Sequence, residues 1–201
     1  MFTYCFNNPS NHFDASGNDA IWIQEGNSAG HQGHTGLMVQ DEDGNWFYFF
    51  WGPSSEDEEA ADIISLCKGV KNGAYYVPYG GDASQKNLYN TATIIEMVHE
   101  ISQTSNLVDR SNLITSTIYL EGDYAQTHEY LDTLCGQNAN CTQPYNLLLN
   151  NCVQKSLYAL SVSDDRFSPY HTIQSADGFT LSLPALHPNY EYKTMPSRLM
   201  R

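Results

Sequence analysis

Tyr145-Asn-Leu-Leu-Leu-Asn-Asn-Cys152 is followed directly by Val153-Gln-Lys-Ser-Leu-Tyr-Ala-Leu160. The second run has apolar residues at helical spacing, and asparagine is a favoured N-cap, so this stretch predicts an amphipathic helix that begins at Cys152. Unpaired N–H groups and the positive end of the helix dipole stabilise a thiolate at such a position. Cys152 is therefore the candidate nucleophile. The alternative is a small side chain buried under a helix.

A β-hairpin far upstream supplies a candidate base. The pattern predicts a strand over 33–40, a turn over 41–45 and a returning strand with the sequence Trp46-Phe-Tyr-Phe-Phe-Trp51. His34 opens the first strand, at a position where alternation would favour a core residue, and we take it as the general base. His31 is the substitute for that role.

This order of elements, with the histidine hairpin first and the Asn-Cys helix more than a hundred residues later, resembles the circularly permuted branch of the NlpC-type papain-like superfamily. Lecithin:retinol acyltransferase-like proteins belong to the same branch. The resemblance implies an α+β fold in which a small antiparallel sheet packs against a helix carrying the nucleophile at its N-terminus. It also implies a Cys-His dyad or triad, whose third polar group lies on the strand after the histidine. Tyr48 and Asn45 are the polar choices there. Tyr145 with the amide of Cys152 is the candidate for the oxyanion site, and a purely structural role for Tyr145 is the alternative.

A second resemblance lies at the N-terminus, in Tyr4-Cys-Phe-Asn-Asn-Pro-Ser-Asn-His-Phe-Asp-Ala-Ser-Gly17. It is similar to the closing motif of the Rhs-repeat core, with Ala15 in place of the usual proline. In Rhs-type polymorphic toxins this motif separates a shell of repeats from a variable C-terminal effector domain. The resemblance implies that residues 1–17 are a remnant of the shell motif and 18–201 the effector domain. The effector would be secreted or injected into a target cell as part of a larger protein, and a cognate immunity protein would be a partner.

Composition narrows the range of functions. A chain of 201 residues with 41% hydrophobic residues can bury the core of one domain. A net charge of -14 disfavours nucleic acid as a partner. No apolar run is long enough for a transmembrane segment, and no signal-peptide pattern follows Met1. We predict no metal and no cofactor, because no Cys-x-x-Cys pair is present to support a zinc site.

The five cysteines are an odd number and form no disulfide framework. Cys135 and Cys141 are close enough in sequence to close a small loop, and the alternative is two reduced loop cysteines. Cys67 is expected to pack on an apolar helical face.

Local patterns predict the remaining elements. We expect a strand over 20–24, a helix from a capping box at Ser55 to Cys67, a strand over 113–120 beside the hairpin, and a helix over 123–134. Residues 90–101 read either as a helix or as a strand entering a helix. Beyond Asp164 we expect irregular chain that wraps the domain.

These patterns together predict a cysteine-dependent acyl hydrolase or transferase. A peptidase or amidase with a peptide substrate is the first choice, and a lipid acyl hydrolase or acyltransferase is the alternative. The aromatic strand over 46–51 fits a lipid surface, although a fully buried strand has the same pattern. An interaction module without catalysis is the alternative of another class.

Overall fold

Alternating apolar sequences form a five-stranded antiparallel sheet with the order β4-β3-β2-β1-β5. The computed structural model describes residues 18–26, 33–54, 63–136, 143–174 and 180–184. The strands of the sheet are β1 (Ala20–Glu25), β2 (His34–Gln40), β3 (Trp46–Phe50), β4 (Tyr75–Pro78) and β5 (Ser116–Leu120). With the helices described below, the fold is α+β with a small antiparallel sheet, as the sequence predicts.

The predicted hairpin is formed by β2 and β3. Its turn is held by the Asp41 carboxylate, which accepts hydrogen bonds from the backbone N–H groups of Asp43 at 3.0 Å and Asn45 at 2.8 Å. Gly44 has a φ of 84°, a left-handed conformation that glycine adopts without strain. The turn residues therefore set the register that pairs Leu37 with Phe49.

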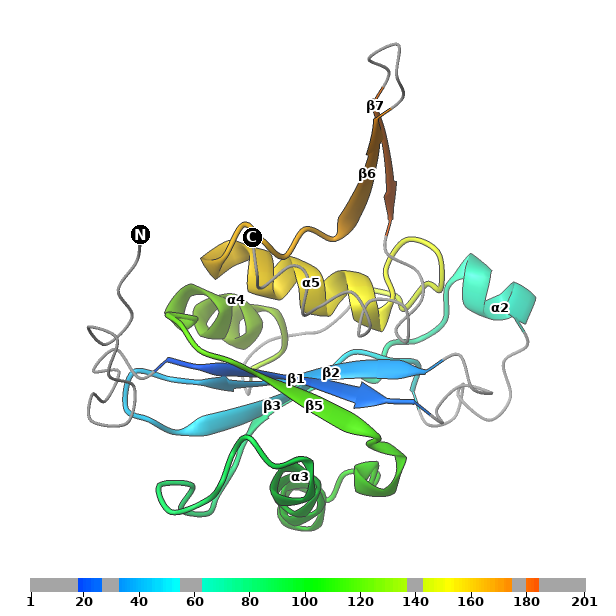
Figure 1. The fold of residues 1–201 in the computed structure, drawn as a ribbon. Coiled ribbons are helices and arrows are strands. Elements are labelled where there is room, and N and C mark those ends of the chain that lie inside the picture. The colour runs from blue at the N-terminus through cyan, green and yellow to red at the C-terminus, as the bar shows by residue number, and fades with distance from the viewer. Residues whose placement is uncertain (1–17, 27–32, 55–62, 137–142, 175–179, 185–201) are drawn as a thin grey trace, which may run out of the picture.

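Helices cover both faces of the sheet (Figure 1). On one face, α4 (Ala125–Cys135) and α5 (Cys152–Ser163) pack against a core that includes Leu37 and Val39 of β2. On the other face, α3 (Thr91–Ser105) packs against a core that includes Met38. Alternate residues of β2 thus serve opposite layers, which accounts for the burial of nearly the whole strand.

The ambiguous stretch over 90–101 is a helix. The side chain of Asn90 caps α3 by accepting a hydrogen bond from the N–H of Ala92 at 2.9 Å. Ile94, Met97, Val98 and Ile101 are buried at helical spacing, so packing on the sheet selects the helix over the strand.

The elements on either side of α3 differ in detail from the prediction. The strand predicted over 113–120 is shorter, because a 3-10 turn, η3 (Ser111–Leu113), precedes β5. β5 pairs with β1, which separates it from the hairpin. The predicted helix over 123–134 is present as α4, with Leu131 buried and Tyr130 and Leu134 half-buried.

The expectation of irregular chain after Asp164 is wrong. Residues Tyr170–Gln174 form β6 and residues Thr180–Pro184 form β7, and the two pair as an antiparallel hairpin, which projects from the α5 side of the sheet in Figure 1. Both segments alternate polar with apolar or β-branched residues, and this preference outweighs the turn signal of the flanking prolines.

Several predictions fall outside the described residues, among them the stub over 1–17, the capping box at Ser55 and His31. The helix that the capping box would begin is described only as α2 (Ile63–Lys68). Cys135 is disulfide-bonded, Cys67 and Cys152 are free thiols, and Cys141 is not among the described residues. No helix in the described part of the chain is both long and apolar enough to cross a membrane.

Candidate functional site

An asparagine caps α5, as the two asparagines before Cys152 predict, and the cap is a full capping box that also includes Gln154. The Asn151 side chain accepts a hydrogen bond from the N–H of Gln154 at 2.9 Å, and the Gln154 side chain accepts one from the N–H of Asn151 at 3.2 Å. This reciprocal pair places Cys152 at the first helical position.

The loop before α5 is held by amide side chains. Asn146 accepts hydrogen bonds from the N–H groups of Leu148 and Leu149, and it donates one to the carbonyl of Cys67 at 2.6 Å. The indole N–H of Trp51, at the end of the hairpin, donates to the carbonyl of Asn150 at 3.0 Å. Side-chain hydrogen bonds therefore connect the loop to α2 and to the sheet, and they fix the position of Cys152 at the end of this loop.

The Cys152 thiol is buried where α5 meets the first residues of β2. Its sulfur accepts hydrogen bonds from the backbone N–H groups of Thr35 and Val153. Only 3% of the residue is exposed, and burial raises the pKa of the Cys152 thiol to about 12, with Glu25 adding to the rise and the two N–H groups and Arg110 opposing it. The sequence expectation of a thiolate at this helix start is therefore wrong for the resting protein, because desolvation outweighs the N–H donors.

His34 is the first residue of β2, and its side chain faces the α3 layer. Strand alternation places it on the face of Met38, and its ring stacks on Phe50 with a centroid separation of 4.7 Å. Gly52 leaves room for this stack, because a Cβ there would lie 2.5 Å from Phe50 Cζ and 3.4 Å from His34 Cε1.

The imidazole of His34 is neutral and incompletely partnered. Burial lowers its pKa well below the ordinary value, and the positive charge of Arg110 lowers it further. Its Nε2 atom is buried and has no hydrogen-bond partner among the described residues. A neutral imidazole can accept a proton, which is the state that a general base requires.

Cys152 and His34 lie near the same end of β2, but their side chains are on opposite faces of the sheet, and no hydrogen bond joins them in the described structure. Thr35 links them, since it follows His34 in β2 and its N–H donates to the Cys152 sulfur. The thiol belongs to the α4 and α5 layer, whereas the imidazole lies on the α3 side.

The other predicted site residues are placed differently. Tyr48 lies on the same face as His34 and donates a hydrogen bond to Glu25 at 3.3 Å. Asn45 is not near this corner, because it lies in the hairpin turn at the opposite end of β2, bound to Asp41. Tyr145 is buried in the same core cluster as Cys152, and its backbone pairs with Val70.

Sequence patterns missed a buried ion pair at this corner. Glu25, the last residue of β1, is fully buried and is the cross-strand partner of His34. Arg110 donates to Glu25 Oε2 from Nε at 2.9 Å and from its terminal nitrogen at 2.8 Å. The only signal in the sequence is that Glu25 directly follows the strand predicted over 20–24, and no local pattern connects it with a residue 85 positions away.

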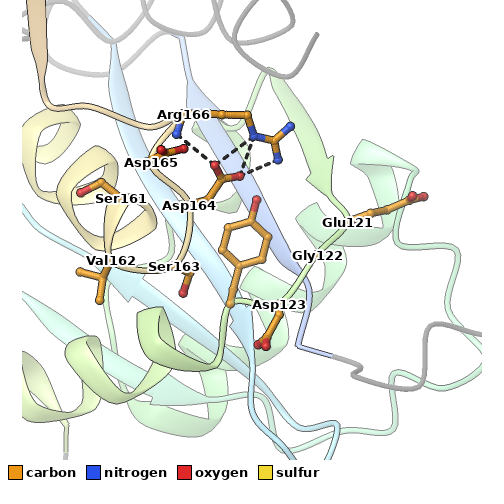
Figure 2. A pocket seen from close by; sticks show the side chains of 10 residues that line it. Glu121, Gly122, Asp123, Ser161, Val162, Ser163, Asp164, Asp165 and Arg166 are labelled. Atoms are coloured by element: carbon orange, nitrogen blue, oxygen red, sulfur yellow. Dashed lines mark hydrogen bonds and ion pairs between the residues drawn. The ribbon is translucent and has the colours of Figure 1, made fainter. Parts of the chain in front are cut away.

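A separate hollow of about 710 Å³ lies at the opposite end of α5. Figure 2 shows Asp164 and Arg166 in it, joined by hydrogen bonds of 2.5 to 2.9 Å. At a rise of 1.5 Å per residue, this end of the helix lies about 16 Å from Cys152. None of the predicted site residues lines the hollow, so it is distinct from the Cys152 corner.

The described residues contain no group of three or more His, Cys, Asp or Glu side chains placed to hold a metal ion. Comparison with known proteins finds no match for this chain among family models, curated proteins or solved structures. The evidence on its function is therefore the geometry of the corner itself, where a capped helix start with two N–H donors to its cysteine sulfur lies beside the first residues of a strand that begins with a neutral histidine.

Proposed function

We propose that the protein is a cysteine-dependent acyl hydrolase or transferase of the permuted papain-like type, with Cys152 as nucleophile and His34 as base. The observation that carries the proposal is the position of the Cys152 sulfur at a capped helix start. There it accepts a hydrogen bond from the N–H of Thr35, the residue next to His34. The order of the elements, with the histidine strand before the cysteine helix, also supports it.

The two pKa shifts determine how the first step would run. The thiol pKa is raised and the imidazole pKa is lowered, so the resting pair is neutral rather than thiolate and imidazolium. Proton transfer from Cys152 to His34 would therefore accompany attack of the sulfur on the substrate carbonyl. The imidazolium then protonates the leaving group, and water attacks the acyl-enzyme to regenerate the thiol.

Attack requires the thiol and the imidazole, whose side chains lie on opposite faces of the sheet here, to come within hydrogen-bond distance at the end of β2. Catalytic hydrogen bonds are often long or poorly aligned before substrate binds and tighten in the complex. The N–H groups of Thr35 and Val153, now directed at the sulfur, are the nearest donors for negative charge that develops during attack.

A peptide or other amide is the first substrate class, and an apolar acyl group is the second. The second is favoured by exposed apolar side chains on the loop before Cys152, since Leu148 is 45% and Leu149 is 78% exposed. α2 lies against this loop through the bond from the N–H of Leu147 to the carbonyl of Leu66, and its Ile64 is 64% exposed. We refer to these exposed apolar side chains, on the loop before Cys152 and on the helix bonded to that loop, as the apolar rim.

The biological setting that we propose is a toxin delivered as part of a larger Rhs-type protein, with a cognate immunity protein as partner. The motif over residues 4–17 supports this setting. If residues 1–17 belong to a shell rather than to the effector, a chain beginning at Asn18 should retain the melting temperature and activity of the full chain.

An inactive interaction module is the competing function, and the burial and raised pKa of Cys152 favour it. Wild type, Cys152→Ala and Cys67→Ala should be expressed in a bacterial host and assayed with short-chain esters, long-chain esters and peptide amides. Cys67 is the matched control because it is a free, half-buried cysteine outside the corner. We expect hydrolytic activity and an acyl adduct on Cys152 in wild type and in Cys67→Ala, and the loss of both in Cys152→Ala. Equal behaviour of all three proteins would refute the proposed enzymatic function.

The choice between peptide and lipid requires a different variant. Leu149→Asn should reduce hydrolysis of long-chain esters but spare peptide amides if the rim binds an acyl chain. Val108→Asn is the control, because Val108 is 59% exposed on another loop.

A further inference from the structure

The buried pair of Glu25 and Arg110 has no role in the chemistry described so far. Glu25 is 0% and Arg110 5% exposed, and Tyr48 donates a third hydrogen bond to the carboxylate. Removing two charges from water is costly, and well-packed apolar side chains would often be at least as stable in their place. Stability alone therefore does not account for an ion pair at this position.

Glu25 is next to His34 in the sheet, and Arg110 is linked to His34 through the ring of Phe50. Glu25 is the direct cross-strand neighbour of His34 on the same face of the sheet. The Arg110 guanidinium lies over the Phe50 ring, 4.8 Å from its centroid, and the same ring stacks on His34. Tyr75 also stacks on Phe50, at 5.0 Å. The aromatic ring that holds the imidazole is thus itself fixed by the cation.

We propose that the Glu25 and Arg110 pair is a positioning element for His34, which fixes the Phe50 stack and keeps the imidazole neutral and able to accept the Cys152 proton. This inference rests on the proposed function. The Glu25 carboxylate neutralises the buried charge of Arg110. Arg110 in turn neutralises Glu25, so that the carboxylate does not stabilise the imidazolium form of His34. Neither residue touches the reacting atoms, so both act through the histidine.

The charges around His34 determine the expected direction of each substitution. On the α3 side of the sheet, Glu25 of β1, Arg110 of the segment before η3 and Tyr48 of β3 lie on the same side as His34, whereas Cys152 at the start of α5 lies on the opposite face. Burial raises the pKa of the Tyr48 phenol well above its ordinary value. Tyr48 and Cys152 are therefore both neutral near pH 7. Arg110 is the charge that lowers the pKa of the imidazole, and Glu25, the cross-strand neighbour of His34, is the buried counter-ion of Arg110.

Histidine titration by NMR in a Cys152→Ala background tests the proposal without requiring turnover. The His34 signal is assigned by its loss in His34→Gln. Arg110→Gln should raise the His34 pKa by about one unit or more, because an adjacent carboxylate then favours the imidazolium. Glu25→Gln should leave the imidazole neutral throughout the accessible range. Arg166→Gln, which breaks an exposed ion pair far from the corner, is the matched control and should change nothing.

The double variant Glu25→Gln with Arg110→Gln covers the case in which a single variant fails to fold. It removes both charges, so the His34 pKa should rise less than in Arg110→Gln but remain above that of wild type. An unchanged His34 pKa in Arg110→Gln or in the double variant would overturn the proposal. If the His34 pKa is unchanged in these variants and the wild-type protein hydrolyses acyl substrates, only the positioning role is refuted. If the His34 pKa shifts as expected and the wild-type protein has no acyl hydrolase activity, only the proposed enzymatic function is refuted.

Discussion

Alkylation of Cys152 as a function of pH is the most direct measure of its environment. Burial raises the thiol pKa from 9.0 to about 12, which lowers the thiolate population at pH 8 roughly a thousandfold. The intrinsic reactivity of a thiolate increases with its pKa, with a Brønsted slope of about 0.4 to 0.5, and this recovers roughly 20-fold. The resting Cys152 should therefore react on the order of 50-fold more slowly than an ordinary exposed thiol.

Iodoacetamide labelling followed by mass spectrometry of the Cys152 peptide provides the assay. Cys67, a free and half-buried thiol, is an internal reference, and labelling in denaturant should equalise the two rates. The rate at Cys152 should still increase with pH above pH 10, where a thiol with a pKa of 9.0 has levelled off. Faster labelling of Cys152 than of a free thiol at pH 7, with a plateau below pH 8, would refute the dominance of desolvation over the helix N-terminus.

Three further predictions concern the same corner. Cys152→Ala and His34→Ala should each reduce acyl transfer on the order of 100-fold or more, and kinetics of the double variant should show little additional loss; additive losses would contradict a nucleophile and base unit. Because the folded-state pKa of His34 is lowered, the unfolded chain binds a proton first as the pH falls, so stability is retained above about pH 6.5 and decreases below it by up to about 1.4 kcal/mol per pH unit. Chemical denaturation across pH 4 to 8 should show this slope in wild type, and a slope that persists unchanged in His34→Gln would assign it elsewhere. Asn151→Ala removes the helix cap and the bond to the Leu147 carbonyl at 2.9 Å, which should lower the free energy of unfolding by about 2 kcal/mol. Asn151→Asp retains the cap acceptor and should lose about half as much in the same denaturation experiment, so equal losses in the two variants would contradict a capping role.

Local chemistry was sufficient to predict the main elements around the corner. The alternation of β1 and the hairpin, the Asp41 turn and the asparagine cap of α5 depend on residues close together in sequence, and each is present. Helical periodicity also identifies α4. The hairpin of β6 and β7 was missed because prolines at its ends masked a two-residue alternation.

The ionisation state of the corner could not be predicted from local pattern. A cysteine at a helix start predicts a lowered pKa, but the depth at which the helix lies on the sheet buries the thiol and reverses the sign. Asn45 is a polar residue on the segment after His34, yet the length of β2 separates the two. The first error arises because sequence spacing specifies the type of element and not what packs over it. The second could have been avoided, because the predicted strand over 33–40 and turn over 41–45 already place Asn45 at the end of the strand away from His34.

Sequence by itself determined that Cys152 begins a capped helix and that His34 begins a strand, since capping and strand alternation involve only near neighbours. Tertiary structure alone decided that the N–H of Thr35 reaches the Cys152 sulfur, that His34 stacks on Phe50, and that Glu25 meets Arg110. These contacts join segments far apart in the chain, and they depend on strand order and on the face of the sheet that each helix covers. Burial, which sets the charge of the thiol and of the imidazole, is a property of that packing and is not encoded at either residue.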